Sequence, residues 1–111
     1  MPIERGGVYW VNFDPSVGGE IRKTRPAIVL SNNAANQVLN RVQVVPITSK
    51  TERVYPSEAL IEVAGEKRKA MADQLTTASK QRIGARIDVL TPEDIARVEA
   101  AIALQLGLRL K

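Results

Sequence analysis

Six short apolar segments, each bounded by turn-forming residues, precede a single helical pattern at the end of this chain. The predicted strands cover residues 7–13, 25–31, 42–48, 59–63, 70–76 and 86–90. Their β-branched and aromatic residues favour extended backbone, and Pro, Gly, Asn and Asp separate them. Several short strands followed by one helix predict a mostly β fold with α, either a packed sheet or a small half-open β-barrel with a terminal helix.

The first predicted strand carries apolar side chains on both of its faces. Neighbouring side chains of a strand point to opposite faces, and here Val8 and Trp10 alternate with Tyr9, Val11 and Phe13. This pattern predicts either a central strand or a strand that contacts both a core and a partner subunit. Because the chain has only one Trp, two Tyr and one Phe, we expect most of these rings, and Trp10 above all, in the core.

The last predicted element is an amphipathic helix of about four turns. Thr91 stands at its N-cap, Pro92 at its first helical position, and two acids in its first turn. Gly107 provides a C-terminal stop. The apolar positions between them recur at helical spacing and are Ile95, Val98, Ile102 and Leu106.

The segments between the strands carry further local predictions. Residues 14–24 contain Pro, Ser and two adjacent glycines, and they predict an exposed flexible loop. Residues 32–41 predict a loop or a short helix, and residues 79–83 a short helical turn. Residues 67–69 predict a basic, solvated turn, and residues 54–55 are candidates to begin the fourth strand.

The residue types that the chain lacks limit its chemistry. It has 111 residues, which allow one domain over 1–111, and it contains neither Cys nor His. The lack of Cys excludes a disulfide framework, a zinc ribbon and a thiol nucleophile. The lack of His excludes Ser-His-Asp hydrolysis and acid–base catalysis by imidazole. Any proton transfer would therefore use Asp, Glu, Arg, Lys, Tyr or hydroxyl groups.

The charge and the hydropathy pattern bear on partners and location. Sixteen Lys and Arg against twelve Asp and Glu give a net charge of +4, which permits a polyanionic partner without requiring one. The N-terminus lacks the apolar core of a signal peptide, and no segment approaches the roughly 20 apolar residues of a membrane span. We therefore expect a cytoplasmic protein without a membrane partner.

Three polar clusters are candidates for chemistry, and each also has a structural interpretation. Residues 20–25 combine Glu20 with three cations that suit a phosphate backbone, or that simply decorate a solvated loop. Residues 48–50, Thr-Ser-Lys, could bind an oxyanion or cap a turn at the end of the third strand. Asp73, followed by Gln74, lies in an otherwise apolar predicted strand, so it is either a functional group or a paired structural acid.

Taken in order, these segments resemble the MazF/PemK toxins over nearly the whole chain. The shared pieces are Arg5-Gly6, an aromatic strand ending at Asp14-Pro15, Gly18 and Glu20, Arg25-Pro26 before an apolar run, Pro46 to Ser49, and Asp73-Gln74. The resemblance implies a small SH3-like half-open β-barrel with a C-terminal helix, as in the related CcdB proteins. It also implies a homodimeric endoribonuclease that cuts single-stranded RNA at short sequences, without metal or cofactor, and that is inhibited by a cognate, acidic, MazE-like antitoxin.

Some of the family's catalytic positions are matched in this sequence and others are not. Arg25 and Thr48 match the commonest catalytic pair, and Glu20 and Asp73 match acids that members use. Two positions differ, because Gly19 stands where some members have histidine and Met71 where some have arginine.

Metal-free RNA cleavage needs a base for the 2′-hydroxyl proton, an acid for the leaving 5′-oxygen, and donors for the charged phosphorane. On this resemblance we assign phosphate stabilisation to Arg25, phosphate positioning to Thr48, and the general base to Glu20 or Asp73. The products would be a 2′,3′-cyclic phosphate and a 5′-hydroxyl. Unstacked bases would be read by loop residues. The expected substrate-binding residues are Gly18, Gly19, Arg22, Lys23, Ser49, Lys50, Arg53, Gln74 and Thr77.

Two other functions stay open on sequence alone. A CcdB-like topoisomerase poison would share the barrel, but it acts through its C-terminal helix, and residues 108–111 do not resemble that inhibitory end. A non-catalytic RNA-binding barrel, or a decayed toxin, would not need the catalytic positions. The presence of Arg25, Thr48, Glu20 and Asp73 argues against decay.

Overall fold

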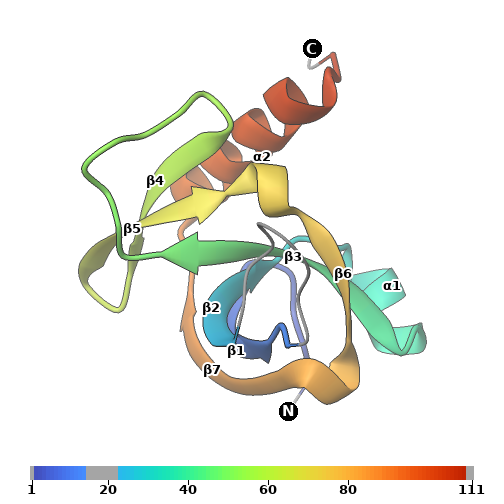
Figure 1. Ribbon diagram of the computed structural model, residues 1–111. Helices are drawn as coiled ribbons and strands as arrows, with labels where there is room; N and C mark the ends of the chain where they lie inside the picture. The colour runs from blue at the N-terminus through green and yellow to red at the C-terminus, as the bar shows by residue number, and fades with distance from the viewer. Residues whose placement is uncertain (1, 15–22, 110–111) are drawn as a thin grey trace.

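The short apolar segments of the chain form strands that pair into one curled antiparallel sheet (Figure 1). The computed structural model describes residues 2–14 and 23–109, and these contain seven strands. The strands are β1 (Gly7–Asn12), β2 (Thr24–Val29), β3 (Arg41–Thr48), β4 (Glu58–Val63), β5 (Glu66–Met71), β6 (Thr76–Ser79) and β7 (Ile83–Val89). The helices are α1 (Asn33–Val38) and α2 (Pro92–Leu106), and the 3₁₀ turns are η1 (Ala72–Gln74) and η2 (Lys80–Arg82).

Strand β3 joins the two parts of the sheet. The strand order is β4-β5-β3-β2-β1-β7, and β6 pairs with β3 off this path. β6 pairs with the first half of β3, over residues 41–44, whereas β5 pairs with its last two residues, Ile47 and Thr48. The sheet therefore splits along one edge of β3 and curls, with α2 beside β4 (Figure 1). This arrangement confirms the predicted half-open β-barrel with a C-terminal helix.

The three middle strands, β1, β2 and β3, are buried on both faces. One apolar core lies between these strands and β4, β5 and α2, and it includes Val8 and Ile28. A second core is enclosed by β1, β2, β3, β6 and the start of β7, and it includes Val11 and Val44. Successive side chains of each middle strand thus serve different cores. The prediction of a central first strand with two apolar faces is confirmed, because β1 lies between β2 and β7.

Helix α2 begins and ends where the sequence predicts. The Thr91 hydroxyl accepts the backbone N–H of Asp94 at 3.1 Å, and Gly107 adopts a left-handed φ of 69° that closes the last turn. The buried Asp94 carboxylate accepts the backbone N–H of Glu62 at 3.0 Å and also binds Arg97 at 2.6 Å. Asp94 therefore ties the first turn of α2 to β4. Neither described helix is long and apolar enough to cross a membrane.

Two predictions about β5 are wrong. The predicted strand over residues 70–76 is divided, because β5 ends at Met71, η1 follows, and β6 begins at Thr76. At this 3₁₀ turn the chain crosses from β5, which pairs with the end of β3, to β6, which pairs with the beginning of β3. The predicted basic turn over residues 67–69 lies inside β5 instead. The hairpin turn is formed by Ala64 and Gly65, whose φ values of 51° and 79° are the positive values that tight hairpins require.

The aromatic residues are less buried than predicted. Trp10 is 45% exposed, so its predicted place in the core is wrong. Its neighbour Tyr9 belongs to the second apolar core, which β6 and β7 help to enclose. Val8 belongs to the first core, beside α2, but that core does not extend to Trp10. Tyr55 is also exposed and precedes β4, which begins at Glu58, so residues 54–55 do not start that strand.

The remaining local predictions need small changes. The segment 32–41 contains α1, and the segment 79–83 contains η2, as predicted. The last strand, predicted over residues 86–90, is longer, since β7 runs from Ile83 to Val89. The extra residues pair with β1, including Val11 with Ile83.

Replacing Asp94 by Ala should lower the free energy of unfolding by about 2 kcal/mol, because the Glu62 N–H would be left without its acceptor. Glu93→Ala is the matched control, since Glu93 is an exposed acid in the same helical turn, and it should cost about 0.5 kcal/mol. Urea denaturation of both variants measures the difference. Equal losses in the two variants would mean that Asp94 acts only as a first-turn charge.

Candidate functional site

A small pocket of about 240 Å³ opens where the start of β2 lies beside the end of β3. Three neighbouring strands and the first residue after β3 contribute its walls. The lining residues are Arg25 and Pro26 from β2, Ile47 and Thr48 from β3, Ser49, and Arg68 from β5. The lining therefore includes two arginines and two hydroxyl-bearing residues.

The register of β2 and β3 brings Arg25 and Thr48 together. Ala27 pairs with Pro46 in this antiparallel ladder, and Arg25 and Thr48 are each two residues further toward the same end. Thr48 is 8% exposed, and its Oγ1 accepts the backbone N–H of Lys50 at 3.2 Å. Since a threonine hydroxyl both donates and accepts, its proton remains able to bind an oxyanion in the pocket.

A buried ion pair supports the far side of this site. Lys69 pairs with Thr48 across the β3–β5 ladder, and its Nζ lies 3.1 Å from Glu58 Oε1, with both side chains about nine-tenths buried. Lys69 Nζ also donates to the carbonyl of Arg53 at 2.8 Å, while Glu58 Oε1 accepts the Tyr55 N–H at 2.8 Å. These bonds fix the segment between β3 and β4 beside the pocket.

Sequence reasoning missed Arg68 and Lys69. The three consecutive basic residues predict a solvated turn, but they lie in β5, where Arg68 lines the pocket and Lys69 forms the buried ion pair. The sequence does contain one local indication of the β4–β5 hairpin. Ala64-Gly65 stands between two strand-forming segments and is compatible with a two-residue hairpin turn. The register between β5 and β3, which pairs Lys69 with Thr48 and places Arg68 next to it along β5, has no signal in a single sequence.

The predicted substrate-binding residues are distributed over several places. Ser49 lines the pocket, and Lys50 is joined to Thr48 through its backbone N–H. Arg53 is exposed, with its guanidinium 5.9 Å from the centre of the Tyr55 ring and 3.2 Å from the Tyr55 hydroxyl. Gly18, Gly19, Glu20 and Arg22 lie outside the described residues.

Lys23 marks the described end of the loop that joins β1 and β2. Its carbonyl accepts the Phe13 N–H and its N–H donates to Asp14 Oδ1, each at 2.8 Å. Arg82 of η2 donates to the carbonyl of Asn12 at 2.9 Å and to that of Asp14. The base of this predicted loop is therefore held from both sides.

Asp73, Gln74 and Thr77 do not line the pocket. Asp73 is exposed on η1 and Gln74 is half-buried there, so the predicted location of Asp73 within a strand is wrong. Thr77 on β6 pairs with Gln43, whose amide donates to its hydroxyl at 3.1 Å. Gln43 lies five residues before Thr48 on β3, a separation of about 16 Å. Thr77 thus belongs to the opposite end of β3.

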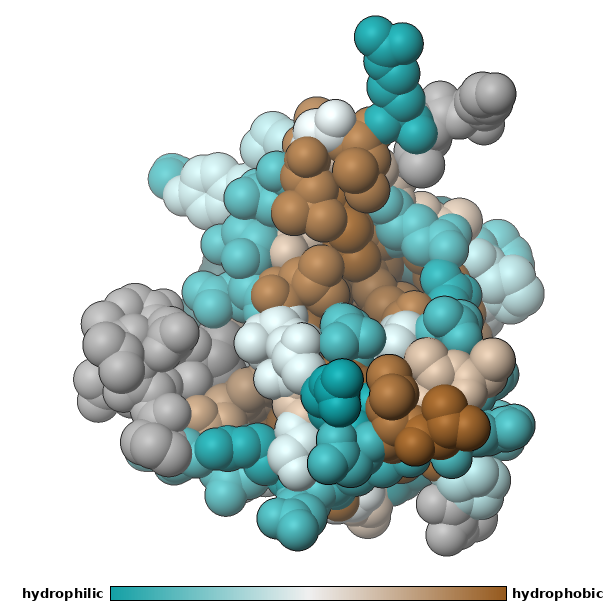
Figure 2. Space-filling view, turned by 90° about the vertical axis from the view of Figure 1, so that its right-hand side faces the viewer, coloured by the Kyte–Doolittle hydropathy of each residue, from teal (hydrophilic) through white to brown (hydrophobic). Residues whose placement is uncertain are grey.

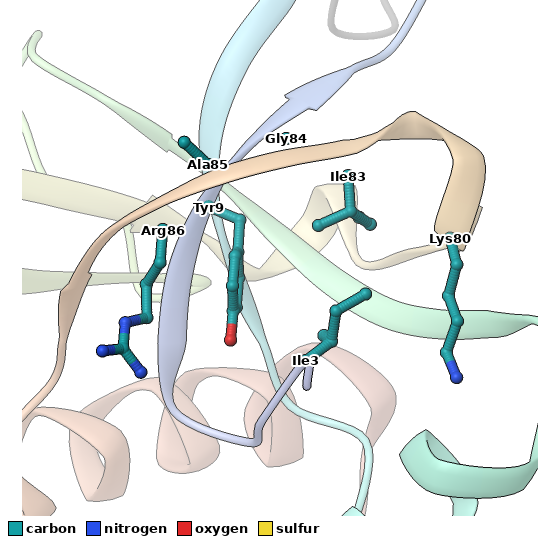
Figure 3. Close-up of a pocket in the computed structure, with 7 residues that line it drawn as sticks. All are labelled: Ile3, Tyr9, Lys80, Ile83, Gly84, Ala85 and Arg86. Atoms are coloured by element: carbon teal, nitrogen blue, oxygen red, sulfur yellow. The ribbon is translucent and has the colours of Figure 1, made fainter. Parts of the chain in front are cut away.

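A second cavity, of about 630 Å³, lies under β7 (Figure 3). The side chains of Tyr9, Arg86 and Lys80 point to the same side of β7 in this view. The other lining residues are Ile3, Ile83, Gly84 and Ala85, and none of the predicted site residues belongs to this lining. Within the described ranges, no group of three acids is placed to hold a metal ion. The pocket beside Thr48 is therefore the candidate site that contains the predicted pair.

Comparison with known protein families identifies the family of this chain. Residues 4–106 match the family of PemK-like, MazF-like toxins of type II toxin–antitoxin systems. The chain belongs to this family. This MazF-like toxin is 31% identical to endoribonuclease MazF9 of Mycobacterium tuberculosis, over 96% of this chain and 98% of the relative. It is 32% identical to endoribonuclease toxin MazF of Escherichia coli K12, over 94% of each chain.

Solved structures of related toxins share the architecture of this MazF-like toxin. MazF from Deinococcus radiodurans superposes with a TM-score of 0.85 and 28% identity, over 97% of this chain and 99% of that one. A mycobacterial endoribonuclease in complex with its cognate antitoxin gives a TM-score of 0.80 and 26% identity, over 97% and 98% of the two chains. The predicted membership of the MazF/PemK family and the predicted fold class are both confirmed.

Replacing Lys69 by Met should lower the free energy of unfolding by about 3 kcal/mol, because the buried Glu58 carboxylate would lose its cation. Lys67→Met, at an exposed position of the same strand, serves as the control and should change stability little. Urea denaturation measures both values. Adding Glu58→Gln to Lys69→Met should recover much of the loss, and failure to recover would show that packing, rather than the unpaired charge, dominates.

Proposed function

We propose that this MazF-like toxin is a metal-independent endoribonuclease that cleaves single-stranded RNA at short sequences to 2′,3′-cyclic phosphate and 5′-hydroxyl ends. The observation that carries the proposal is the convergence of Arg25 and Thr48 on one pocket at the junction of β2 and β3. The relatives named endoribonucleases, each matching more than nine-tenths of this chain, support the reaction type.

Arg25 and Thr48 provide complementary donors for a scissile phosphate. The guanidinium of Arg25 is planar and permanently charged, so it suits the non-bridging oxygens of a phosphodiester. Thr48 is held by the Lys50 N–H, which accounts for one lone pair and leaves the hydroxyl proton for the phosphate. Donors fixed before the reaction stabilise the charge that develops on the phosphorane without reorganising.

The proton transfers require groups other than these two donors. In the proposed reaction a carboxylate takes the 2′-hydroxyl proton, the 2′-oxygen attacks phosphorus, and the leaving 5′-oxygen takes up a proton. Glu20 and Asp73 are the two candidate bases. Asp73 lies on η1 outside the pocket lining, which favours Glu20 for this step.

Replacing Arg25 or Thr48 by Ala should lower the cleavage rate by about 10²-fold or more, because each change removes a phosphate donor. Arg41→Ala and Thr76→Ala are matched controls, since both residues are exposed on strands away from the pocket, and both should cleave at the wild-type rate. The assay is cleavage of a defined single-stranded RNA in EDTA, with identification of the product ends.

The same assay separates the proposed activity from the two alternatives. Site-specific cuts with 5′-hydroxyl ends support the nuclease, whereas near wild-type cleavage by either pocket variant would contradict the catalytic assignment. Intact RNA together with stalled gyrase would indicate a topoisomerase poison. Intact RNA with shifted mobility would indicate a non-catalytic binding protein.

We also propose a cognate acidic antitoxin as the protein partner of this cytoplasmic toxin. Solved structures of related toxins include MazE–MazF from Deinococcus radiodurans and a mycobacterial endoribonuclease in complex with its cognate antitoxin. The net charge of +4, the pocket-lining Arg25 and Arg68, and the exposed Lys50 and Arg53 that follow β3 are complementary to an acidic peptide. An acidic tail that folds on binding would cover the same surface as the RNA.

An apolar face supports the proposed homodimer. Figure 2 shows hydrophobic residues that extend from the C-terminal end of α2 across this side of the molecule. A groove of about 750 Å³ lies here, lined partly by Leu30, Leu75, Ile102 and Leu108. Leu106 and Leu108 are each more than half exposed. Apolar surface of this extent is typical of a protein interface, and we assign it to a second copy of the chain.

Leu108→Glu should shift the protein toward the monomer, because it places a charge in the apolar groove. Val89→Glu is the control, since Val89 is similarly exposed but lies on β7 outside the groove. Sedimentation velocity at micromolar concentration measures the oligomeric state. A wild-type protein that is monomeric under these conditions would contradict the proposed dimer.

A further inference from the structure

Arg68 is the charged residue of the pocket to which the family resemblance assigns no role. We propose that Arg68 is a second phosphate-contacting residue, which binds the scissile phosphate of RNA together with Arg25. This role rests on the proposed RNA cleavage. It concerns a residue that enters the pocket from a different strand and that local sequence reasoning assigns to a solvated turn.

The strand order places the two arginines on the two strands that flank β3. β3 lies between β2 and β5, and Thr48 is its last residue. Arg25 reaches the pocket from β2, whereas Arg68 reaches it from β5, one residue from the Lys69 that pairs with Thr48. Both arginines therefore line one pocket at the end of β3, where a phosphate would meet the two strands that flank Thr48.

The contacts of Arg68 leave it able to bind an anion. Its Nη1 donates to the carbonyl of Lys67 at 2.8 Å and its Nη2 to Glu66 Oε2 at 3.1 Å. A guanidinium has five N–H groups, so these two bonds orient Arg68 without using all of its donors. The Glu66 side chain is 66% exposed, and an ion pair so open to solvent holds its arginine weakly.

The lining of the pocket selects for a phosphodiester. The six described lining residues include two arginines and two hydroxyl residues, and none of the six carries a carboxylate. A guanidinium fork matches the non-bridging oxygens of phosphate, and hydroxyl groups add hydrogen bonds. The pair of arginines is therefore suited to an anion with two exposed oxygens.

The role of Arg68 in the reaction is electrostatic. The 2′-oxygen forms a bond to phosphorus as the bond from phosphorus to the 5′-oxygen breaks, and negative charge grows on the two non-bridging oxygens. Arg25 would bind one of these oxygens and Arg68 the other. Since arginine stays protonated in proteins, Arg68 stabilises this charge and transfers no proton.

The alternative is that Arg68 only pairs with Glu66 to stiffen the β4–β5 hairpin. In that case, removing either partner would have the same effect. If Arg68 binds phosphate, loss of Glu66 removes a competitor for its guanidinium. Glu66→Gln therefore separates the two roles, because it breaks the ion pair and leaves Arg68 in place.

The test compares four variants, Arg68→Ala, Arg68→Lys, Lys67→Ala and Glu66→Gln, on an RNA oligonucleotide that the wild type cleaves. Arg68→Ala should lower kcat/KM by about 10²-fold, and Arg68→Lys should lie between Ala and wild type, because lysine keeps the charge but loses the fork. Lys67→Ala removes the same charge from an exposed neighbour and should cleave like the wild type. Glu66→Gln should cleave at least as fast as the wild type.

A binding measurement provides a second readout that a structural role would not change. The probe is the same RNA with a 2′-deoxy nucleotide at the scissile position, which cannot be cleaved. Arg68→Ala should reduce the slope of log Kd against log salt by about 0.7, the value for one lost contact on a single strand. Lys67→Ala should leave the slope unchanged, and circular dichroism melting verifies that each variant is folded.

The possible failures are distinguishable. Cleavage by Arg68→Ala at the rate of Lys67→Ala would overturn the role of Arg68 and leave the proposed nuclease intact. A parallel loss in Glu66→Gln and Arg68→Ala would assign Arg68 to hairpin structure instead. A wild-type protein that cuts none of a transcript pool would overturn the proposed function, and the role of Arg68 with it.

Discussion

The pairing of β3 with three other strands is the constraint on which the rest of this structure depends. β2 runs along one edge of β3, while β6 and β5 divide the other edge between them. A strand in that position is enclosed, so Val44 and Val45 are both fully buried although they point to different faces. The two apolar cores meet along β3, and the curl of the sheet follows from the division of its edge.

The candidate site lies where this enclosure ends. Thr48 is the last residue of β3, paired with Lys69 of β5, and its hydroxyl accepts the Lys50 N–H at the edge of the pocket that Thr48 lines. The two arginines of the pocket come from different elements. Arg25 lies near the start of the apolar strand β2, and Arg68 lies in β5 of the β4–β5 hairpin. A rigid strand end with flanking cations holds donors in fixed positions, which is the property that electrostatic catalysis requires.

The sequence predicted those features that depend on neighbours along the chain. The caps of α2 are local, and Thr91, Pro92 and Gly107 each act within one helical turn. The order and spacing of Arg25 and Thr48 identified the family pair, although only strand register brings them together. Trp10 was misplaced because the extent of each core depends on which strands cover it. The division of residues 70–76 and the positions of Arg68 and Lys69 also depend on register with β3, which a single sequence does not contain.

The closed base of the loop between β1 and β2 has a consequence for how such toxins diversify. The backbone hydrogen bond from the Phe13 N–H to the Lys23 carbonyl, with Arg82 bound to the carbonyl of Asn12, holds the two described ends of the loop together. A loop whose two ends are fixed by the barrel tolerates changes of sequence and length between those ends at little cost in stability, because loop closure depends only weakly on loop length.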